Sequence, residues 1–400
     1  MRSRAAVTVG AWMTERCDIA VVGLGAMGSA AAWHAARAGA RVVGIDRWTP
    51  PHAHGSTHGD TRITRLAIGE GAEYVPLAVR SHELWREIEA ATGASLLVQC
   101  GGAVLGAADA RGQHGADDFL AATLEAGRAH GIAVEELDAA ALAEALPPFA
   151  LRGDERGVLE PSAGYVRPER AVAAQLELAG AAGASLRYGA RVVAVGDGRV
   201  ELDDGTVVHA DRIVLSAGAW LPTLRPELAH AFTVTRQVLH WFALANATAS
   251  YAAHRDLPVY IWLTGAGAEE LFYGFPAIDG PGGGVKVASE QFARPLDDPD
   301  TLDREVPAGE SAAMHARYLA ARLPGLAART VKARACLYTT TADSAFAIDT
   351  HPEDETLLVV SPCSGHGFKH SAAIGEAVAQ LALTGTSTID LSPFGLGRLL

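Results

Sequence analysis

A glycine-rich loop near the start of the chain constrains its fold more than any other feature. Residues 18–22 form a short apolar run that predicts a buried parallel strand, and GLGAMG follows at residues 23–28. An Ala-rich segment at 29–38 predicts a helix, and a second apolar run at 41–45 predicts the next strand. This order of strand, GxGxxG, helix and strand is typical of a Rossmann-type dinucleotide-binding fold.

Each glycine of the loop has a physical role. Gly23, Gly25 and Gly28 allow a tight turn and the close approach of a pyrophosphate, which the N-terminus of the following helix stabilises. Asp46 ends the second strand, 18 residues after the last glycine, and would accept hydrogen bonds from a ribose diol. The same carboxylate would repel the 2′-phosphate of NADP. The motif therefore predicts NAD or FAD, without deciding between them, and its context disfavours a turn that binds nothing.

The composition excludes several functional classes. The 400 residues suffice for two or three domains, and the net charge of −13 argues against nucleic acid as a partner. No apolar run reaches the ~18 residues that a membrane span requires. The four cysteines form neither a disulfide framework nor a CxxC metal site. We therefore expect a cytoplasmic protein with no metal and no membrane partner.

Apolar patterns beyond the loop indicate how the chain is organised. Residues 96–105 predict a strand, 115–147 predict acidic helices, and 185–220 and 231–300 predict β-structure. A strand at 357–360, followed by a helix, returns the pattern to α/β. We expect an α/β fold in which a Rossmann-type nucleotide-binding domain is interleaved with a β-sheet-rich substrate domain. The expected nucleotide-binding segments are 16–96, 160–230 and 339–400, the substrate segments are 97–159 and 231–338, and residues 1–14 are expected to be a disordered extension.

Three sites outside the glycine loop carry chemically capable groups. HGDTRITR at 58–65 is either a solvated polar loop or a loop facing a redox ring, where a cation would stabilise an anionic ring or a substrate carboxylate. Lys286 follows three glycines, and the chain has only two other lysines, Lys332 and Lys369. Because arginine is the ordinary cation of this chain, each lysine invites a specific explanation. Cys336 has strand-like neighbours, and the residues alone favour a buried structural cysteine.

Several segments, in chain order, resemble the monomeric sarcosine oxidase / N-methyltryptophan oxidase family of FAD-dependent amine oxidases. The resemblance runs from about Cys17 to the C-terminus, and it implies a D-amino-acid-oxidase-like fold. The HGDTR loop and the SGHGFK segment are its most specific parts. The matching segments are Pro50 to Arg65, Glu70 with Tyr74 to Leu77, Tyr273 to Pro276, Cys336 to Thr339, and Ser364 to Lys369.

The resemblance implies a cofactor and a reaction. The family attaches the 8α-methyl group of its FAD to a cysteine as a thioether, and the matching residue is Cys336. The family oxidises secondary amines, so the implied substrate is a secondary or cyclic α-amino acid. Examples are sarcosine, N-methyltryptophan, proline and pipecolate. A hydride equivalent passes to the flavin, the imine is hydrolysed, and O₂ is reduced to H₂O₂.

The resemblance also implies roles for individual residues. Arg65 and Lys369 match the residues that hold the substrate carboxylate, and Lys286 matches the lysine that promotes the reaction with O₂. A compact ammonium can hold a water beside the ring, where a broad guanidinium would not fit. The implied catalytic residues beside the flavin are His58, Arg62 and Tyr273, and the further implied FAD contacts are Val192, Gly218, Tyr338, Gly365 and Gly367.

Departures from the family pattern leave the identity of the amine open. Ile68 stands where the family has an aromatic residue, Glu290 where it often has His, and His370 where it often has Phe. We expect these changes to touch the walls of the pocket. For Glu290 we favour a position facing water, with a contact to a cationic group of the substrate as the alternative. Lys332 has no assignment.

Other functions stay open beside the oxidase. An FAD-dependent dehydrogenase with another electron acceptor is the main alternative, and Lys286 argues against it. A non-catalytic flavin-binding protein is disfavoured because the carboxylate-binding cations are retained. The expected partners are a small amino acid and O₂, and the expected state is a monomer.

Overall fold

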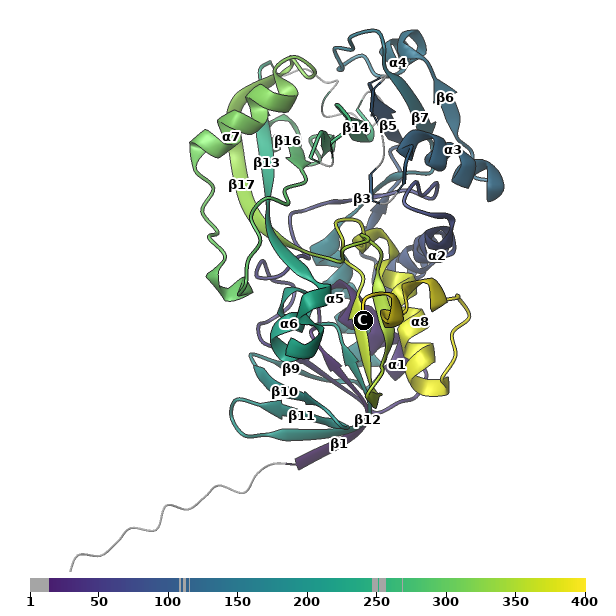
Figure 1. Ribbon diagram of the computed structural model, residues 1–400, viewed down its shortest axis with the longest axis vertical. Coiled ribbons are helices and arrows are strands. Elements are labelled where there is room, and N and C mark those ends of the chain that lie inside the picture. Colours follow the sequence, from purple (N-terminus) through teal and green to yellow (C-terminus); the bar gives the residue numbers. More distant parts are fainter. Residues whose placement is uncertain are drawn as a thin grey trace, which may run out of the picture.

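The computed structural model describes residues 14–107, 109–110, 113–114, 116–246, 251, 257–267 and 269–400. Two large sheets lie at opposite ends of the molecule (Figure 1). Most of the extension expected over residues 1–14 falls outside the described residues, but Thr14 already belongs to the first strand. In the described part of the chain, no helix is long and apolar enough to cross a membrane.

The first sheet carries the glycine loop. Its path runs β10-β11-β12-β1-β2-β9, and β19 extends it from β12 with β18 at its edge. β1 lies parallel to both β12 and β2, and β19 is parallel to β12. The parallel core therefore combines strands from the start, middle and end of the chain. The strands are β1 (Thr14–Val22), β2 (Val42–Asp46), β9 (Ser185–Tyr188), β10 (Val192–Gly196), β11 (Arg199–Leu202), β12 (Val207–Leu215), β18 (Ala347–His351) and β19 (Asp354–Ser361).

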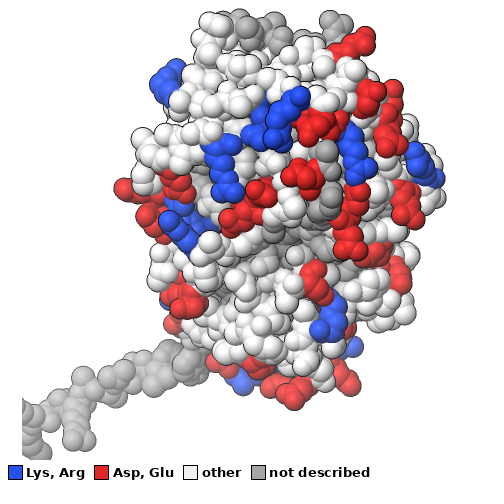
Figure 2. Space-filling model, turned by 45° about the horizontal axis from the view of Figure 1, so that its top comes forward, with Lys and Arg blue, Asp and Glu red and all other residues white. Residues whose placement is uncertain are grey.

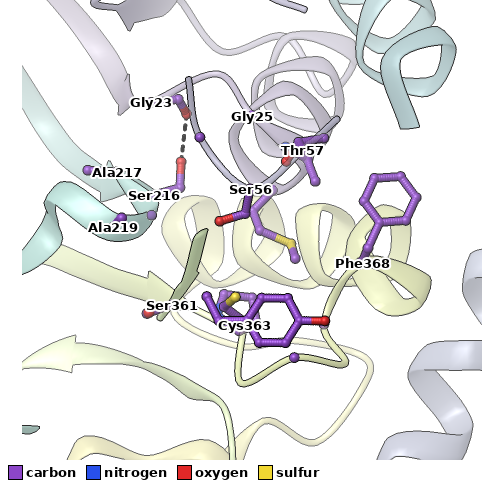
Figure 3. A pocket seen from close by; sticks show the side chains of 18 of the residues that line it. Gly23, Gly25, Ser56, Thr57, Ser216, Ala217, Ala219, Ser361, Cys363 and Phe368 are labelled. Atoms are coloured by element: carbon purple, nitrogen blue, oxygen red, sulfur yellow. Dashed lines mark hydrogen bonds between the residues drawn. The ribbon is translucent and has the colours of Figure 1, made fainter. Parts of the chain in front are cut away.

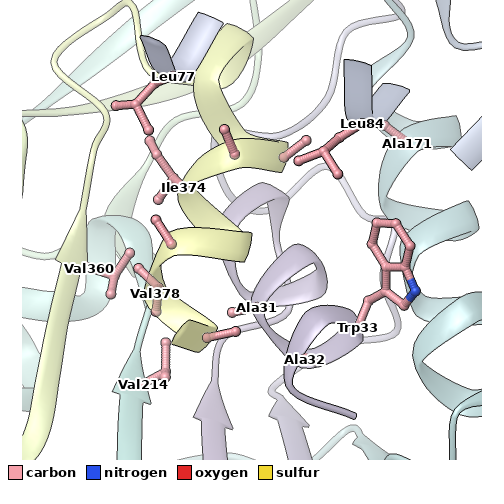
Figure 4. Close-up of a cluster of buried hydrophobic side chains, with 14 of the residues drawn as sticks. Ala31, Ala32, Trp33, Leu77, Leu84, Ala171, Val214, Val360, Ile374 and Val378 are labelled. Atoms are coloured by element: carbon pink, nitrogen blue, oxygen red, sulfur yellow. The ribbon is translucent and has the colours of Figure 1, made fainter. Parts of the chain in front are cut away.

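Helices cover the first sheet and bury its apolar side chains. α1 contacts α5 and α8, and α2 also contacts both of these helices. Figure 4 shows side chains of these helices meeting Val214 of β12 and Val360 of β19. α1 and α8 approach closely because small residues face each other. A Cβ added at Gly375 of α8 would lie 2.2 Å from the Cβ of Ala30 of α1. The helices are α1 (Ala26–Arg37), α2 (Val75–Thr92), α5 (Pro168–Ala181) and α8 (Ser371–Thr384).

The second sheet is almost entirely antiparallel. Its order is β17-β13-β16-β15-β14-β5-β7-β6, and only β14 and β5 pair in parallel. A small third sheet has the order β3-β8-β4. The strands of the second sheet are β5 (Gly102–Gly106), β6 (Glu135–Leu137), β7 (Arg156–Glu160), β13 (Thr233–Leu244), β14 (Val259–Leu263), β15 (Leu271–Gly274), β16 (Val285–Ser289) and β17 (Leu326–Thr340). The remaining elements are β3 (Arg62–Thr64), β4 (Leu97–Val98), β8 (Gly164–Val166), α3 (Phe119–Ala129), α4 (Ala139–Ala145), α6 (Leu221–Leu224), α7 (Ala308–Met314) and a π-helical turn at His315–Leu319.

Two local predictions were wrong in detail. The strand predicted at 96–105 is split into β4 and β5, because Gly101 between them has a φ of 78° and breaks the extended backbone. The helical region predicted at 115–147 contains α3 and α4 with strand β6 between them. The expected α/β class and the interleaved order of the two large sheets are confirmed. The domain boundaries remain our proposal.

Candidate active site

A long cavity joins the glycine loop to the second sheet. Its volume is about 370 Å³, and its lining residues come from both large sheets. Gly23, which follows β1, and Asp46, the last residue of β2, line it, and so do Arg65, Tyr273 and Lys369. In Figure 3 the glycine loop faces the segment that leads from β19 into α8. A ligand in this cavity would therefore contact the predicted nucleotide site and a group of charged side chains.

The glycine loop has no room for side chains where the backbone folds on itself. Gly23 has a φ of 87°, and a Cβ there would lie 2.5 Å from the carbonyl oxygen of Ser216. The hydroxyl of Ser216 donates a hydrogen bond of 2.7 Å to the carbonyl of Gly23 (Figure 3). A Cβ at Gly28 would lie 1.8 Å from that same carbonyl oxygen. A Cβ added at Gly25 would meet Thr57 Oγ1 at 3.5 Å, which is an ordinary contact distance. The space before α1 is therefore open for a pyrophosphate.

The carboxylate of Asp46 is buried at the same end of the cavity. Its Oδ2 accepts a hydrogen bond of 2.8 Å from the backbone N–H of Leu24, and its Oδ1 accepts one of 2.8 Å from Trp48. These bonds fix the carboxylate while each oxygen keeps acceptor capacity for a ribose hydroxyl. The predicted FAD contacts Val192 and Gly218 also line the cavity.

The SGHGFK segment (residues 364–369) makes a turn that requires its glycines. Gly365 has a φ of 82°, and a Cβ at Gly367 would lie 1.5 Å from the carbonyl oxygen of Pro362. Both glycines line the cavity. The turn brings the backbone close to any ligand and places Lys369 in a short 3-10 turn (Phe368–His370) directly before α8.

Arg65 and Lys369 meet on one buried carboxylate, that of Glu70. An Nη of Arg65 donates to Glu70 Oε2, and Lys369 Nζ lies 3.0 Å from Glu70 Oε1. All three side chains are at most 5% exposed. Burial lowers the pKa of Lys369 to about 8, although Glu70 opposes this shift, and the two cations hold the pKa of Glu70 well below its usual range against the effect of burial.

The guanidinium of Arg62 lies between the cavity and Cys336. It donates to the carbonyls of Ser56 at 2.6 Å and Thr61 at 3.0 Å, and its Nη2 is 3.9 Å from Cys336 Sγ. Burial acts to lower the pKa of Arg62, but the surrounding Cys336 and tyrosine groups raise it overall. Cys336 is 1% exposed and does not line the cavity, whereas Cys363 does.

Lys286 is held beneath the HGDTR loop rather than on the cavity wall. Its Nζ donates to the carbonyls of Gly59 at 2.7 Å and Thr61 at 2.6 Å, and it lies 4.6 Å from the centre of the Phe275 ring. Burial, reinforced by repulsion from Arg62, lowers the pKa of Lys286 well below its ordinary value. Phe275, whose ring Lys286 contacts, lines the cavity, so Lys286 lies directly behind the cavity wall.

The remaining predicted catalytic side chains differ in their access to the cavity. The hydroxyl groups of Tyr273 and Tyr338 are 3.3 Å apart, and both residues line the cavity. Burial raises the pKa of Tyr273 to about 12, so its hydroxyl stays protonated at neutral pH. Burial, followed by the charge of Arg62, lowers the pKa of His58 to about 3, so its imidazole is neutral. His58 does not line the cavity.

The expectation for the three departures from the family pattern was wrong for two of them. Ile68 and His370 are both 0% exposed and belong to packed interior rather than to the cavity wall. His370 lies against the rings of Tyr74 and Phe346. Glu290 does line the cavity, but it is 5% exposed, so the favoured position facing water was also wrong.

Sequence reasoning missed three contributors to the site. Glu70 belongs to a matching segment but received no role, although a glutamate close in sequence to Arg65 could have suggested an ion pair. His114 lies 3.2 Å from Glu290. Its backbone has a left-handed φ of 49°, and no sequence pattern predicted this conformation or this contact. Lys332, which had no assignment, pairs with Asp60 of the HGDTR loop at 2.5 Å.

The glycine cradle and the charged far part of the cavity define a dinucleotide-binding protein with an attached substrate chamber. The sequence matches the family described as FAD dependent oxidoreductase over residues 18–381. The chain belongs to this family, so its dinucleotide is FAD and the protein is an oxidoreductase. Within the family it belongs with the monomeric sarcosine oxidases and N-methyltryptophan oxidases.

Relatives of known activity match over nearly their whole length. A monomeric sarcosine oxidase of Streptomyces avermitilis is 38% identical over 97% of this chain and 99% of its own. An N-methyl-L-tryptophan oxidase of Salmonella arizonae is 34% identical over 95% of this chain and 98% of its own. Among solved structures, the amino acid oxidase NikD in its open form superposes with a TM-score of 0.82 at 25% identity, covering 95% of this chain and 97% of its own.

Proposed function

We propose that the protein is an FAD-dependent oxidase of a secondary or cyclic α-amino acid. The proposal rests on the net positive charge of the cluster formed by Arg65, Glu70 and Lys369. Arg65 and Lys369 bring two positive charges to the cavity, and Glu70 neutralises one of them. A substrate carboxylate would complete the balance, because a buried charge is stable only when it is paired.

The names of the relatives support the choice of amine. They include oxidases of sarcosine and of N-methyl-L-tryptophan, both of which are N-methyl amino acids. We infer an N-methyl amino acid or a cyclic amino acid of the proline or pipecolate type as the substrate. Glu290, which lines the cavity, distinguishes it from the family pattern.

The cavity residues bind and orient the substrate. FAD, when bound, accepts a hydride equivalent from the carbon next to the substrate nitrogen and is reoxidised by O₂, while the imine product is hydrolysed. Arg65 and Lys369 fix the carboxylate, so the neighbouring carbon takes a defined position. The protonated hydroxyls of Tyr273 and Tyr338 provide hydrogen-bond donors in the same chamber.

A panel of amines tests the reaction. Sarcosine, N-methyltryptophan, proline and pipecolate are each mixed with the purified protein without oxygen, and loss of the yellow flavin absorbance is followed. At least one should bleach the flavin, and the same compound should yield one H₂O₂ per imine in air. No bleaching by any member would contradict the proposal, whereas bleaching without H₂O₂ would favour a dehydrogenase with another acceptor.

The reaction with O₂ is assigned to Lys286. A cation close to the ring would lower the barrier to forming superoxide, which is an anion. Lys286→Met should slow reoxidation of the reduced flavin by about a hundredfold or more, the scale of losing one preorganised charge, and should change flavin reduction far less. Rapid mixing of each half-reaction measures both rates. Equal slowing of the two half-reactions would argue against the role in oxygen reactivity.

We further propose that FAD is bound covalently at Cys336. The sulfur lies beside Ser56 and Arg62, which both line the cavity, and the guanidinium of Arg62 can stabilise negative charge that develops on it. Acid-precipitated protein should stay yellow, and Cys336→Ala should release the chromophore to the supernatant. Cys363→Ala is the matched control, because this thiol lines the cavity and should not affect retention. Loss of the colour in Cys363→Ala alone would move the attachment to that residue.

A further inference from the structure

A buried carboxylate in the cavity has an oxygen that no described residue uses. Glu290 follows β16, and its side chain is 5% exposed. Its Oε1 lies 3.2 Å from Nε2 of His114, but its Oε2 has no hydrogen-bond partner in the described part of the chain. Buried carboxylate oxygens are rarely left without a donor, because the loss of hydration is costly.

The surroundings of Glu290 place its carboxylate at the substrate chamber. A Cβ added at Gly365 would lie 2.9 Å from Glu290 Oε1 and 3.0 Å from the ring of Tyr338. Glu290, His114 and Tyr338 all line the cavity that Lys369 also lines. The negative charge therefore shares one chamber with the cations proposed to hold the substrate carboxylate.

The other described cations of the chamber do not contact Oε2. Arg65 and Lys369 contact Glu70, and Arg62 is held by backbone carbonyls. His114, whose pKa Glu290 raises against the effect of burial, lies against the other oxygen, Oε1. The Glu290 oxygen therefore lacks a donor until a ligand supplies one. A plain carboxylate could balance the Arg65 cluster but would leave this oxygen unpaired, whereas a molecule that also carries N–H groups with positive charge would satisfy both.

We propose that Glu290 Oε2 accepts a hydrogen bond from a protonated nitrogen of the substrate, and so selects zwitterionic amino acids over plain carboxylates. This inference rests on the proposed function, because it assumes that the chamber binds an amino acid. The nitrogen is either the amine next to the carboxylate or a cationic group on the substrate side chain. Glu290 thereby becomes a specificity-determining residue.

Two pairs of probes of matched shape distinguish these sources. 2-Aminoisobutyrate and pivalate differ only in an ammonium that replaces a methyl group, and the ammonium is next to the carboxylate. 6-Aminohexanoate and heptanoate make the same exchange at the far end of a chain. Calorimetric titration of the FAD-loaded protein at pH 7 gives the dissociation constant Kd of each probe.

The wild type should bind at least one cationic probe about tenfold or more tightly than its methyl counterpart. Glu290→Gln, which keeps the shape, should remove that preference and leave the Kd of the plain carboxylate within about twofold. Glu290→Asp, which keeps the charge, should retain part of the preference. Glu201→Gln, at a 40% exposed side chain of β11 that does not line the cavity, is the matched control and should bind all four probes as the wild type does.

The results separate this inference from the proposed function. 2-Aminoisobutyrate has no hydrogen on the carbon next to its nitrogen, so its binding does not depend on oxidation. Loss of preference in the first pair assigns Glu290 to the reacting amine, and loss in the second pair assigns it to a side-chain cation. Three outcomes would overturn the inference. The preference could survive in Glu290→Gln, it could be lost in Glu290→Asp as fully as in Glu290→Gln, or the wild type could show no preference in either pair. Failure of the bleaching panel concerns the proposed function alone.

Discussion

At the scale of single residues, the chamber is a balance of buried charges. Arg65, Glu70 and Lys369 share one network, in which the two cations lower the pKa of Glu70 against the effect of burial and Glu70 opposes the lowering of the pKa of Lys369 by burial. Burial disfavours the ammonium of Lys369 more than that of a surface lysine, so its pKa is lowered to about 8. The charge of Lys369, which we propose binds the substrate carboxylate, is therefore close to titrating under mildly alkaline conditions.

This balance predicts a pH dependence of carboxylate binding. Lys369 is protonated below its pKa of about 8 and loses its charge as the pH rises through that value. The Kd of pivalate, which has no group that titrates in this range, should be constant near pH 6 to 7 and should rise above about pH 8. Lys369→Met should bind pivalate weakly and without this dependence, as titrations at several pH values would show. The same rise in Lys369→Met would refute the assignment.

At the scale of secondary-structure elements, close packing of small residues holds the first sheet together. The strand, glycine loop and helix at the start of the chain were predictable, because local periodicity and loop glycines fix them. The pairing of α1 with α8 was not predictable from local pattern, since the two helices lie more than 300 residues apart in the chain. Their contact requires Gly375, which faces Ala30.

Gly375 and Gly180 provide a matched comparison of this packing. Gly375→Ala would place a Cβ 2.2 Å from Ala30, so the helices must separate, and we expect a loss of about 1–3 kcal/mol in the free energy of unfolding. At Gly180, in α5, an added Cβ meets nothing within 4 Å, so Gly180→Ala should be neutral or stabilising by up to about 1 kcal/mol. Denaturant unfolding measures both. Equal effects at the two positions would show that helix propensity, rather than packing, decides the outcome.

At the scale of the whole molecule, two lysines of the second sheet bind the HGDTR loop, which follows strand β2 of the first sheet. Lys286 of β16 binds the carbonyls of Gly59 and Thr61, and Lys332 of β17 pairs with Asp60 between them. The ring of Trp241 lies 4.4 Å from Lys332 and 5.6 Å from Lys286. On the face drawn in Figure 2, acidic and basic side chains are intermixed rather than gathered by sign.

The junction should contribute modestly to stability. The side chains of Lys332 and Asp60 are 35% and 28% exposed, so solvent and salt screen their attraction. Lys332→Met should lower the free energy of unfolding by about 1 kcal/mol or less, with a smaller effect at high salt. A double-mutant cycle with Asp60→Asn, which tolerates the φ of 68° at this position, isolates the pair. A coupling of several kcal/mol would contradict this account.

The sequence by itself determined the nucleotide-binding end of the protein. Gly23, Gly28 and Asp46 act within a short stretch of chain, where backbone sterics and strand order leave few alternatives. The positions of Arg65 and Lys369 also followed from matching segments, and the structure brings them together on Glu70.

Only the tertiary structure decided which unusual residues reach the cavity. Ile68, Glu290 and His370 look equally informative in the sequence, yet only Glu290 lines the chamber. The partner of Lys332 lies 272 positions away in the chain, and His114 and Glu290 are also far apart in the sequence. Such contacts depend on how sheets and loops pack, and no local pattern of apolar and polar residues encodes them.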